Sequence, residues 1–432
     1  MHPIQELFKK RTTGNPVGLY SCCSANEYVL CAVLSRSKST GIPALIECTA
    51  NQVDQFGGYT GMKPEEFYHY VEKLACQEGL SMDRVILGGD HLGPLKWIQL
   101  DEKEAMKNAK ELVRQYVLAG FTKIHLDTSM RLENDSVRCR LSDEVIARRS
   151  AELCTVAEQA YSERVKRVPD AEKPVYIIGS EVPIPGGEQE SIDTISVTRP
   201  EELRNTISVF QKKYKEMGLA DAWQRVIGVV VQPGVEFGDD NVFEYNRQNA
   251  RMLTDTLKDY PNLVLEGHST DYQTPDLLKE MVEDGIAILK VGPALTFALR
   301  EGLIALELIE KELLAGQGIW MSDFGNTLET AMLKNPSHWK KYYHGNGVDQ
   351  RLARTFSYSD RARYYLPDPV VNASIERLLN NLSETIIPNT LISQYMPIQY
   401  TKVRQGTLSA NARSLLIDRI GNCIDDYLYA VM

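Results

Sequence analysis

The feature that most constrains the fold of this chain is a regular alternation of short apolar runs with longer amphipathic segments. Eight apolar runs of strand type alternate with segments of helical periodicity, and this alternation stops near residue 314. Such an alternation favours a parallel sheet covered by helices, and eight repeats favour a closed (β/α)8 barrel. We therefore predict an α/β fold in which residues 1–314 form a (β/α)8 TIM barrel and residues 315–432 form a helical C-terminal extension packed on it.

The apolar runs end in chemically active side chains rather than in ordinary turn residues. The clearest case is the run over residues 84–94, in which an apolar strand and two glycines lead directly into Asp90 and His91. The carboxyl ends of barrel strands form one rim, where barrel enzymes hold their catalytic groups. In chain order, the residues predicted on this rim are Ser21, Ser24, Glu47, Thr49, Asn51, Asp90, His91, Asp127, Ser129, Glu181, Gln232, His268, Ser269, Asp271, Lys290 and Gly292.

Strand alternation also places charged residues inside the predicted barrel. Because side chains two apart share a face of a strand, the apolar partners of these residues face the helices and the polar ones face inward. The inward residues are Glu47, Lys123, His125, Asp127, Glu266, His268 and Lys290. Burying such groups is costly unless they are paired or bind an ion. They form either a buried network of salt bridges or an active site open at the mouth of the barrel, and we favour the active site.

Two imidazoles, a carboxylate and an amide oxygen on this rim form a predicted metal site. The expected ligands are His91, Glu181, Gln232 and His268, each from a different strand. This set suits Zn²⁺ best, with Mn²⁺, Co²⁺ or Fe²⁺ as alternatives. His125 competes for the site, but it lies deeper in its strand and is expected to be a supporting or core residue.

Asp90 is the first candidate for acid–base chemistry because it adjoins a predicted metal ligand. The alternative role for Asp90 is to orient the imidazole of His91, since metal-bound histidines often have a carboxylate partner. Asp127 and Glu181 are further candidates for catalysis, and Asp271 is a weaker one of the same kind.

A phosphate site is predicted where the last barrel helix begins. Gly292 opens this helix, and barrels often bind phosphate at this place through backbone N–H groups and the helix dipole. Lys290 adds positive charge, and Arg361 and Arg363 of the extension are expected to reach over the mouth unless they belong to an ordinary surface segment. The other predicted substrate contacts are Asn51, Ser129, Ser269 and Asp271.

Composition excludes several classes of protein. The formal net charge of −10 disfavours a nucleic-acid binder, although a local site can still bind an anion. The sequence has no apolar run of the ~20 residues that cross a membrane, and residues 1–13 show no secretory signal. We expect a cytoplasmic protein that forms a homo-oligomer.

Several motifs resemble one family along nearly the whole chain. These motifs are Gly89-Asp90-His91-Leu92-Gly93-Pro94, Ile124-His125-Leu126-Asp127, Glu181-Val182-Pro183, Val231-Gln232-Pro233-Gly234, His268-Ser269-Thr270-Asp271 and Lys290-Val291-Gly292-Pro293. They are similar to the GatZ/KbaZ family, the Z-type components of class II tagatose-bisphosphate aldolases. The resemblance implies a metal on a (β/α)8 barrel, with Asp90 and His91 as acid–base residue and ligand, and with His268 as a late ligand. Gln232 stands where class II aldolases have a histidine ligand.

The resemblance implies two functions. One is a metal-dependent 4-epimerase that interconverts D-tagatose 6-phosphate and D-fructose 6-phosphate by retro-aldol and aldol chemistry. The other is a non-catalytic subunit that stabilises a separate class II D-tagatose-1,6-bisphosphate aldolase chain. Both functions share these motifs, and we favour the epimerase because the set of rim residues is complete.

Overall fold

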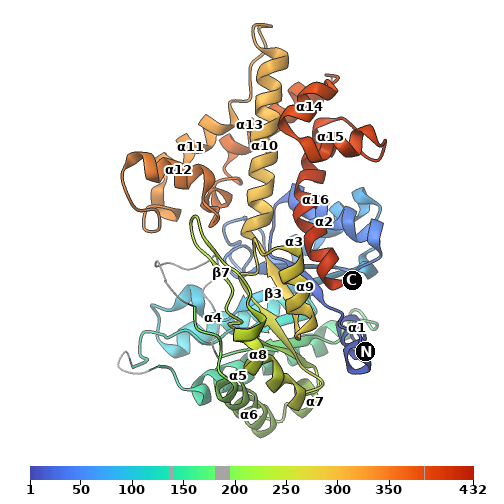
Figure 1. The fold of residues 1–432 in the computed structure, drawn as a ribbon. Coiled ribbons are helices and arrows are strands. Elements are labelled where there is room, and N and C mark those ends of the chain that lie inside the picture. Colours follow the sequence, from blue (N-terminus) through green and yellow to red (C-terminus); the bar gives the residue numbers. More distant parts are fainter. Residues whose placement is uncertain (137–139, 181–194, 384) are drawn as a thin grey trace.

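A closed barrel of eight parallel strands forms the centre of the computed structural model (Figure 1). The structure describes residues 1–136, 140–180, 195–383 and 385–432. The strands follow one another around the barrel in chain order, and β1 closes it by pairing with β10. They are β1 (Leu19–Cys22), β2 (Ala44–Thr49), β3 (Val85–Leu92), β4 (Lys123–Leu126), β5 (Val175–Ile178), β6 (Val226–Val231), β9 (Val264–Gly267) and β10 (Ile286–Val291). The predicted (β/α)8 barrel is confirmed.

Helices cover the outside of the barrel, and most of them begin where the sequence carries an N-cap. Asn26, Asp101 and Ser142 each accept a hydrogen bond from a backbone N–H of the first turn that follows. The helices up to the last barrel strand are α1 (Pro3–Lys9), α2 (Glu27–Thr40), α3 (Pro64–Glu78), α4 (Glu102–Ala119), α5 (Asp143–Val165), α6 (Pro200–Glu216), α7 (Ala220–Trp223), α8 (Arg247–Thr256) and α9 (Pro275–Glu283). A short antiparallel ribbon, β7 (Glu236–Phe237) with β8 (Val242–Phe243), lies between β6 and α8.

The long helix α10 (Pro293–Leu314) follows β10 and rises from the barrel into a second, helical lobe (Figure 1). This lobe contains α11 (Phe324–Lys334), α12 (Gly347–Phe356), α13 (Pro369–Ser383), α14 (Asn389–Tyr395) and α15 (Pro397–Arg404). The last helix, α16 (Ala412–Val431), returns to the barrel and packs on α10, α2 and α9. The division of the chain at residue 314 into two domains stays a prediction.

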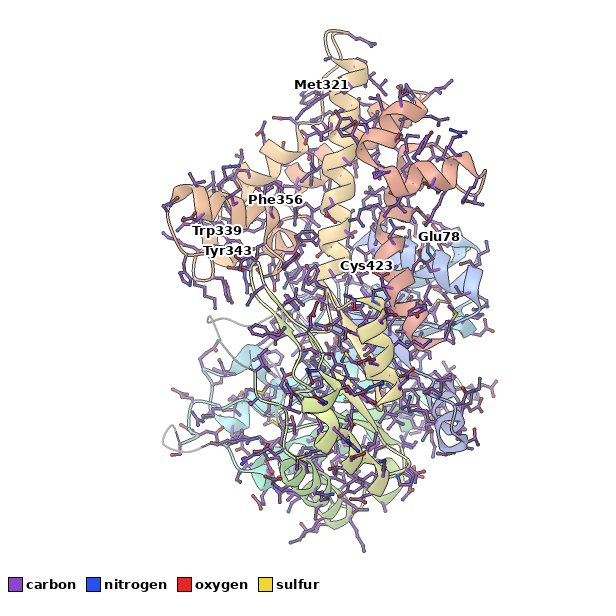
Figure 2. The ribbon with its side chains drawn as sticks, viewed as in Figure 1. Glu78, Met321, Trp339, Tyr343, Phe356 and Cys423 are labelled. Carbon is purple, nitrogen blue, oxygen red and sulfur yellow. The ribbon has the colours of Figure 1, made fainter. Side chains whose placement is uncertain are left out.

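Aromatic and ionic contacts hold the second lobe together. Trp339 donates its indole N–H to the carbonyl oxygen of Met332 at 2.7 Å and stacks on Tyr343 (Figure 2). A buried clamp then joins the lobe to the barrel: Asp360 accepts from Arg300 Nε at 3.0 Å and from Thr296 Oγ1 at 2.6 Å, and both donors lie on α10. The segment around Asp360 is therefore fixed above the end of β10. Among the described helices, none is long and apolar enough to cross a membrane.

Candidate active site

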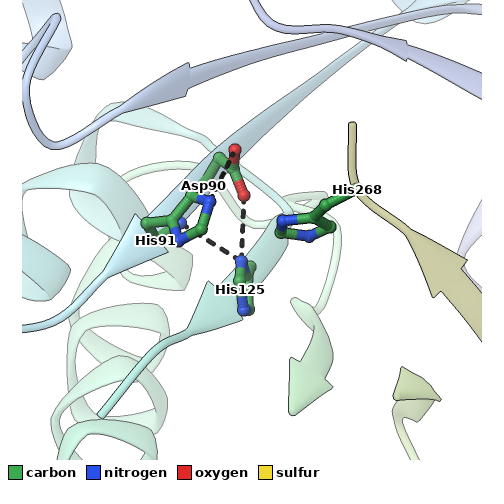
Figure 3. Close-up of side chains that lie close together, drawn as sticks. All are labelled: Asp90, His91, His125 and His268. Atoms are coloured by element: carbon green, nitrogen blue, oxygen red, sulfur yellow. Dashed lines mark hydrogen bonds and ion pairs between the residues drawn. The ribbon is translucent and has the colours of Figure 1, made fainter. Parts of the chain in front are cut away.

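A buried cluster of three imidazoles and one carboxylate lies at the mouth of the barrel (Figure 3). Asp90 and His91 lie in β3, His125 lies in β4, and His268 follows β9. Each of the four offers a nitrogen or oxygen that could bind a metal, and these atoms lie within 4.8 Å of one another. Residues from three strands, far apart in the chain, therefore converge on a space of the size of one ion.

A local irregularity of β3 brings Asp90 and His91 to the same place. In a regular strand, neighbouring side chains point to opposite faces. The register between β3 and β4 shifts between Gly89 and Leu92, and His91 adopts a left-handed backbone with a φ of 50°. Such a φ is rare and strained for a residue other than glycine. The strain is consistent with a functional role, because it turns the imidazole toward the mouth beside Asp90.

Each imidazole of the cluster has a carboxylate partner. His91 Nδ1 lies 3.0 Å from Asp127 Oδ2, and His268 Nε2 lies 2.9 Å from Glu266 Oε1. The third, His125, has Nδ1 2.9 Å from Asp90 Oδ1. Such partners fix the tautomer and the orientation of an imidazole, which is what carboxylates around metal-bound histidines do.

Below the cluster, two lysines join the carboxylates into one network inside the barrel. Lys123 Nζ lies 2.7 Å from both Glu47 Oε1 and Glu266 Oε2, and all three side chains are fully buried. Lys290 Nζ lies 3.1 Å from Glu47 Oε2 and 2.8 Å from Asp90 Oδ1. Gly88 leaves room for this network, because a Cβ there would come within 2.6 Å of Glu47 Cγ. The network therefore spans the barrel from β2 to β10.

The network shifts the protonation of its members. Burial opposes ionisation of Asp90, but the charges of His91 and Lys290 outweigh it and hold the pKa of this carboxyl well below its usual range. Burial likewise raises the pKa of Asp127, but its hydrogen bond with His91 brings the pKa to about 2. Burial lowers the pKa of His268 to about 4, although the hydrogen bond with Glu266 acts to raise it. Near neutral pH, His268 is thus a neutral imidazole, the form that binds metals.

The donor set fits a divalent cation. Three imidazoles and a carboxylate suit Zn²⁺ and its neighbours in the first transition row. His125 turns its Nδ1 toward Asp90 and His91, and its Nε2, which has no hydrogen-bond partner among the described residues, points away from them (Figure 3). With neutral imidazoles, four carboxylates face two ammonium groups in the network, which leaves two negative charges for a divalent ion to balance. His91, His125 and His268 are the residues that would hold it, with the carboxylate of Asp90 beside them.

A cavity of about 280 Å³ opens above the cluster, between the barrel and the second lobe. Asp90, His91 and His268 contribute to one wall, and the extension contributes Arg363, Tyr364, Leu366, Pro367 and Asn372. Of the predicted substrate contacts, the cavity is lined by Asn51, Ser269, Asp271, Lys290, Gly292 and Arg363. Three further residues line the cavity, Cys23, Tyr59 and Tyr364, and nothing in their local sequence pattern marks them as site residues.

Several predicted site residues lie elsewhere. The side-chain oxygen of Gln232 accepts the backbone N–H groups of Gly234 at 2.8 Å and Val235 at 3.1 Å, so it holds the turn after β6 rather than facing the cluster. His125, which the sequence analysis placed in a supporting role, lies in the cluster instead. Ser129 donates to Asp127 Oδ1 at 2.7 Å and does not line the cavity. Glu181 lies outside the described residues.

The two arginines predicted to reach over the mouth, Arg361 and Arg363, differ in whether they line the cavity. Arg361 is buried against the ring of Tyr342, at 3.1 Å from the ring centre, and does not line the cavity. Arg363 does line it, and its guanidinium donates to the carbonyl oxygen of Asp360 at 3.0 Å and to the Tyr364 hydroxyl at 3.1 Å. Within the described part of the chain, no carboxylate lies within ion-pair distance of Arg363. It is a fixed cation that faces the cavity.

The predicted phosphate site at the start of α10 is already filled by the chain. Asp271 Oδ1 accepts the backbone N–H of Gly292 at 3.0 Å and that of Ala294 at 2.8 Å. Burial raises the pKa of Asp271 to about 6, although these two hydrogen bonds act to lower it. The N–H of Gly292 is therefore already bonded to a carboxylate, and its binding of phosphate stays a prediction.

Comparison with known proteins identifies the family. Residues 4–432 match the model of the D-tagatose-1,6-bisphosphate aldolase subunit GatZ/KbaZ-like family. The chain belongs to this family. The crystal structure of a probable tagatose 6 phosphate kinase from Sinorhizobium meliloti 1021 is similar to this GatZ/KbaZ-like chain at 43% sequence identity and a TM-score of 0.87. The match covers 96% of this chain and 100% of that protein.

Two aldolases are more distant neighbours of the GatZ/KbaZ-like chain. The YdjI aldolase from Escherichia coli K12 is 11% identical with a TM-score of 0.40, and the match covers 89% of this chain and 98% of that one. A fructose-bisphosphate aldolase from Campylobacter jejuni is 15% identical with a TM-score of 0.42, with coverages of 88% and 91%. The family relation, rather than these two structures, ties the chain to the carbohydrate chemistry of tagatose-bisphosphate aldolases.

Proposed function

We propose that this GatZ/KbaZ-like chain is a metal-dependent 4-epimerase that interconverts D-tagatose 6-phosphate and D-fructose 6-phosphate. The observation that carries the proposal is one cavity with a metal-binding cluster in one wall and the cation of Arg363 in another. The descriptions of the family and of the similar Sinorhizobium meliloti protein both contain a tagatose phosphate, which supports the choice of sugar.

The position of C4 restricts the chemistry. The hydrogen on C4 is not adjacent to the C2 carbonyl, so simple enolisation cannot invert this carbon. Breaking the C3–C4 bond can: the electron pair stays on the three-carbon half as an enediolate, and C4 becomes an aldehyde. Rotation of the aldehyde and re-addition of the same pair to its other face give the C4 epimer, with no atoms gained or lost.

In this proposal Asp90 moves the required proton. Its carboxylate takes the proton of the C4 hydroxyl as the C3–C4 bond breaks, and returns it when the bond forms again. The ammonium group of Lys290, 2.8 Å from Asp90 Oδ1, keeps Asp90 ionised, so the base is ready before the sugar arrives. A bound divalent cation supplies Lewis-acid stabilisation for the negative charge that develops on the sugar oxygens.

Binding of the phosphate falls to Arg363 in this proposal. A guanidinium recognises phosphate with paired, charge-assisted hydrogen bonds. Asp360 holds the segment that carries Arg363 against α10. The C6 phosphate at Arg363 then leaves C3 and C4 to reach toward Asp90, since both groups line the same cavity.

The test follows the product directly. Purified protein loaded with Zn²⁺ is mixed with D-tagatose 6-phosphate, and D-fructose 6-phosphate is measured by ¹³C NMR. We expect conversion by the wild type and a loss of about 100-fold or more in Asp90→Asn, the range expected for a lost acid–base group. Asp83→Asn is the matched control, because Asp83 is exposed and lies just before β3 begins. Absence of product with the metal bound would refute the proposal.

A second function is favoured by the family description, which names an aldolase subunit. In this case the chain stabilises a separate class II aldolase chain and performs no reaction itself. Co-expression with a class II tagatose-bisphosphate aldolase distinguishes the two functions. Co-purification and a more stable aldolase, together with an Asp90→Asn variant that supports the aldolase fully, would favour the subunit role.

A further inference from the structure

Asp271 occupies the place in this barrel that most resembles an anion site. It follows β9, is 2% exposed and lines the cavity. Its Oδ1 accepts the N–H groups of Gly292 and Ala294 at 3.0 and 2.8 Å. Pro293, which lies between them, has no N–H to offer. Gly292, Pro293 and Ala294, where α10 begins, therefore present no free backbone donor to a ligand.

The negative charge of Asp271 also opposes the binding of an anion. A helix N-terminus attracts anions through its free N–H groups and its dipole. Here the carboxylate consumes the donors and leaves a negative charge beside them. A phosphate placed at this end of the cavity meets repulsion where a barrel commonly offers attraction.

The cavity has few basic side chains that could bind an anionic group. In the described part of the chain, the cavity is lined by two basic side chains, Lys290 and Arg363. Lys290 is already paired with Asp90 at 2.8 Å and Glu47 at 3.1 Å. Among the described residues, Arg363 donates to carbonyl and hydroxyl oxygens alone, at Ser359, Asp360 and Tyr364. The cavity thus offers one cation to one anionic group.

We propose that Asp271 sets the substrate class by excluding a second phosphate, so that the site takes ketohexose monophosphates and rejects bisphosphates. This inference rests on the proposed function. The C6 phosphate binds Arg363, and the uncharged C1 hydroxymethyl group lies beside Asp271 and donates a hydrogen bond to its carboxylate. A ketohexose 1,6-bisphosphate has no such neutral end.

Binding measurements on the whole metal-loaded protein test this inference without relying on turnover. Isothermal calorimetry compares D-fructose 6-phosphate with D-fructose 1,6-bisphosphate. We expect the wild type to bind the monophosphate at least about tenfold more tightly, because two like charges a few ångströms apart repel strongly at low dielectric. Arg363→Gln should weaken the binding of both ligands.

The Asp271→Asn variant tests the effect of the negative charge apart from that of the hydrogen bonds. The amide oxygen still accepts the two backbone N–H groups, so the loop keeps its hydrogen bonds while the negative charge is lost. We expect the affinity for the bisphosphate to rise about tenfold, while that for the monophosphate changes less than about threefold. Asp271→Ser, which frees both donors, is the second variant and should shift the preference further. Asp276→Asn, at a carboxylate outside the cavity lining, should behave as the wild type.

The outcomes separate this inference from the proposed function. Equal affinity of the wild type for the two ligands, or an unchanged preference in folded Asp271→Asn and Asp271→Ser, would overturn the role of Asp271 alone. A clear monophosphate preference without any epimerisation would uphold the role of Asp271 and refute the epimerase. If neither ligand binds, both proposals fail.

Discussion

The buried lysine of β4 offers the sharpest test of how this barrel holds its polar interior. Lys123 is fully buried, and its ammonium group lies 2.7 Å from a carboxylate oxygen of Glu47 and 2.7 Å from one of Glu266. Both carboxylates are also fully buried. Glu266 in turn holds His268, so Lys123 supports the cluster through one intermediate.

Replacing this lysine with methionine keeps most of the side-chain volume and removes the charge. Among the described residues, Lys290 is then the remaining ammonium group near these two carboxylates, 3.1 Å from Glu47 Oε2. Removing one partner of a buried ion pair costs about 3–5 kcal/mol, because the remaining charge is uncompensated. Lys290 offsets part of the loss at Glu47, so we expect Lys123→Met to lower the free energy of unfolding by about 3 kcal/mol.

Urea denaturation followed by far-UV circular dichroism measures this loss. Lys107→Met is the matched control, because Lys107 is largely exposed and its ion pair with Glu104 spans one helical turn. The control should change the free energy of unfolding by no more than about 0.5 kcal/mol. A triple variant that adds Glu47→Gln and Glu266→Gln removes the unpaired charges and should recover part of the loss. A loss below about 1 kcal/mol in Lys123→Met would refute the reasoning.

Three further predictions concern metal binding by the histidine cluster, phosphate binding by Arg363 and the contribution of His2 to stability. His91→Ala and His268→Ala should each weaken Zn²⁺ binding more than about 100-fold in a competition assay with a chelator. Losing a residue that only orients a metal ligand costs about 10- to 100-fold in affinity, and losing a ligand itself should cost more. Arg363→Gln should raise the KM for D-tagatose 6-phosphate about 10- to 100-fold, while Arg351→Gln, on the exposed side of α12, should not. Burial lowers the pKa of His2 from 6.5 to about 4, so the unfolded chain binds more protons between these values. Stability should fall as pH falls through this window, by at most about 3 kcal/mol, and His2→Gln should lack this loss in urea titrations at pH 7 and 4.

Strand alternation predicted the barrel and most of its polar interior from the sequence. A strand has a strict period of two, so the apolar residues around Glu47, Lys123 and Glu266 reveal which face turns inward. The positions of the strand ends placed His91 and His268 on one rim. Their actual meeting also depends on the bulge in β3 and on the left-handed backbone of His91, which alternation cannot show.

The parts of the site that sequence reasoning missed depend on local hydrogen bonds. Gln232 follows β6 at the expected rim, but its amide oxygen accepts two backbone N–H groups of the next turn. Asp271 looked like an acid–base candidate, yet it caps the helix that was expected to bind phosphate. His125 sits deep in β4, and the closeness of its ring to His91 and His268 depends on packing across strands. Residue type and strand phase do not determine these choices of hydrogen-bond partner.

The most direct measurement of the central claim is the reverse half of the reaction. Zn²⁺-loaded protein is incubated with dihydroxyacetone and D-glyceraldehyde 3-phosphate, the two fragments that cleavage of the C3–C4 bond would give, and the ketohexose 6-phosphates formed are separated and counted. Our account predicts that both C4 epimers, D-tagatose 6-phosphate and D-fructose 6-phosphate, appear with the wild type and that neither appears with Asp90→Asn. Formation of neither epimer by wild-type protein that holds its metal would contradict it.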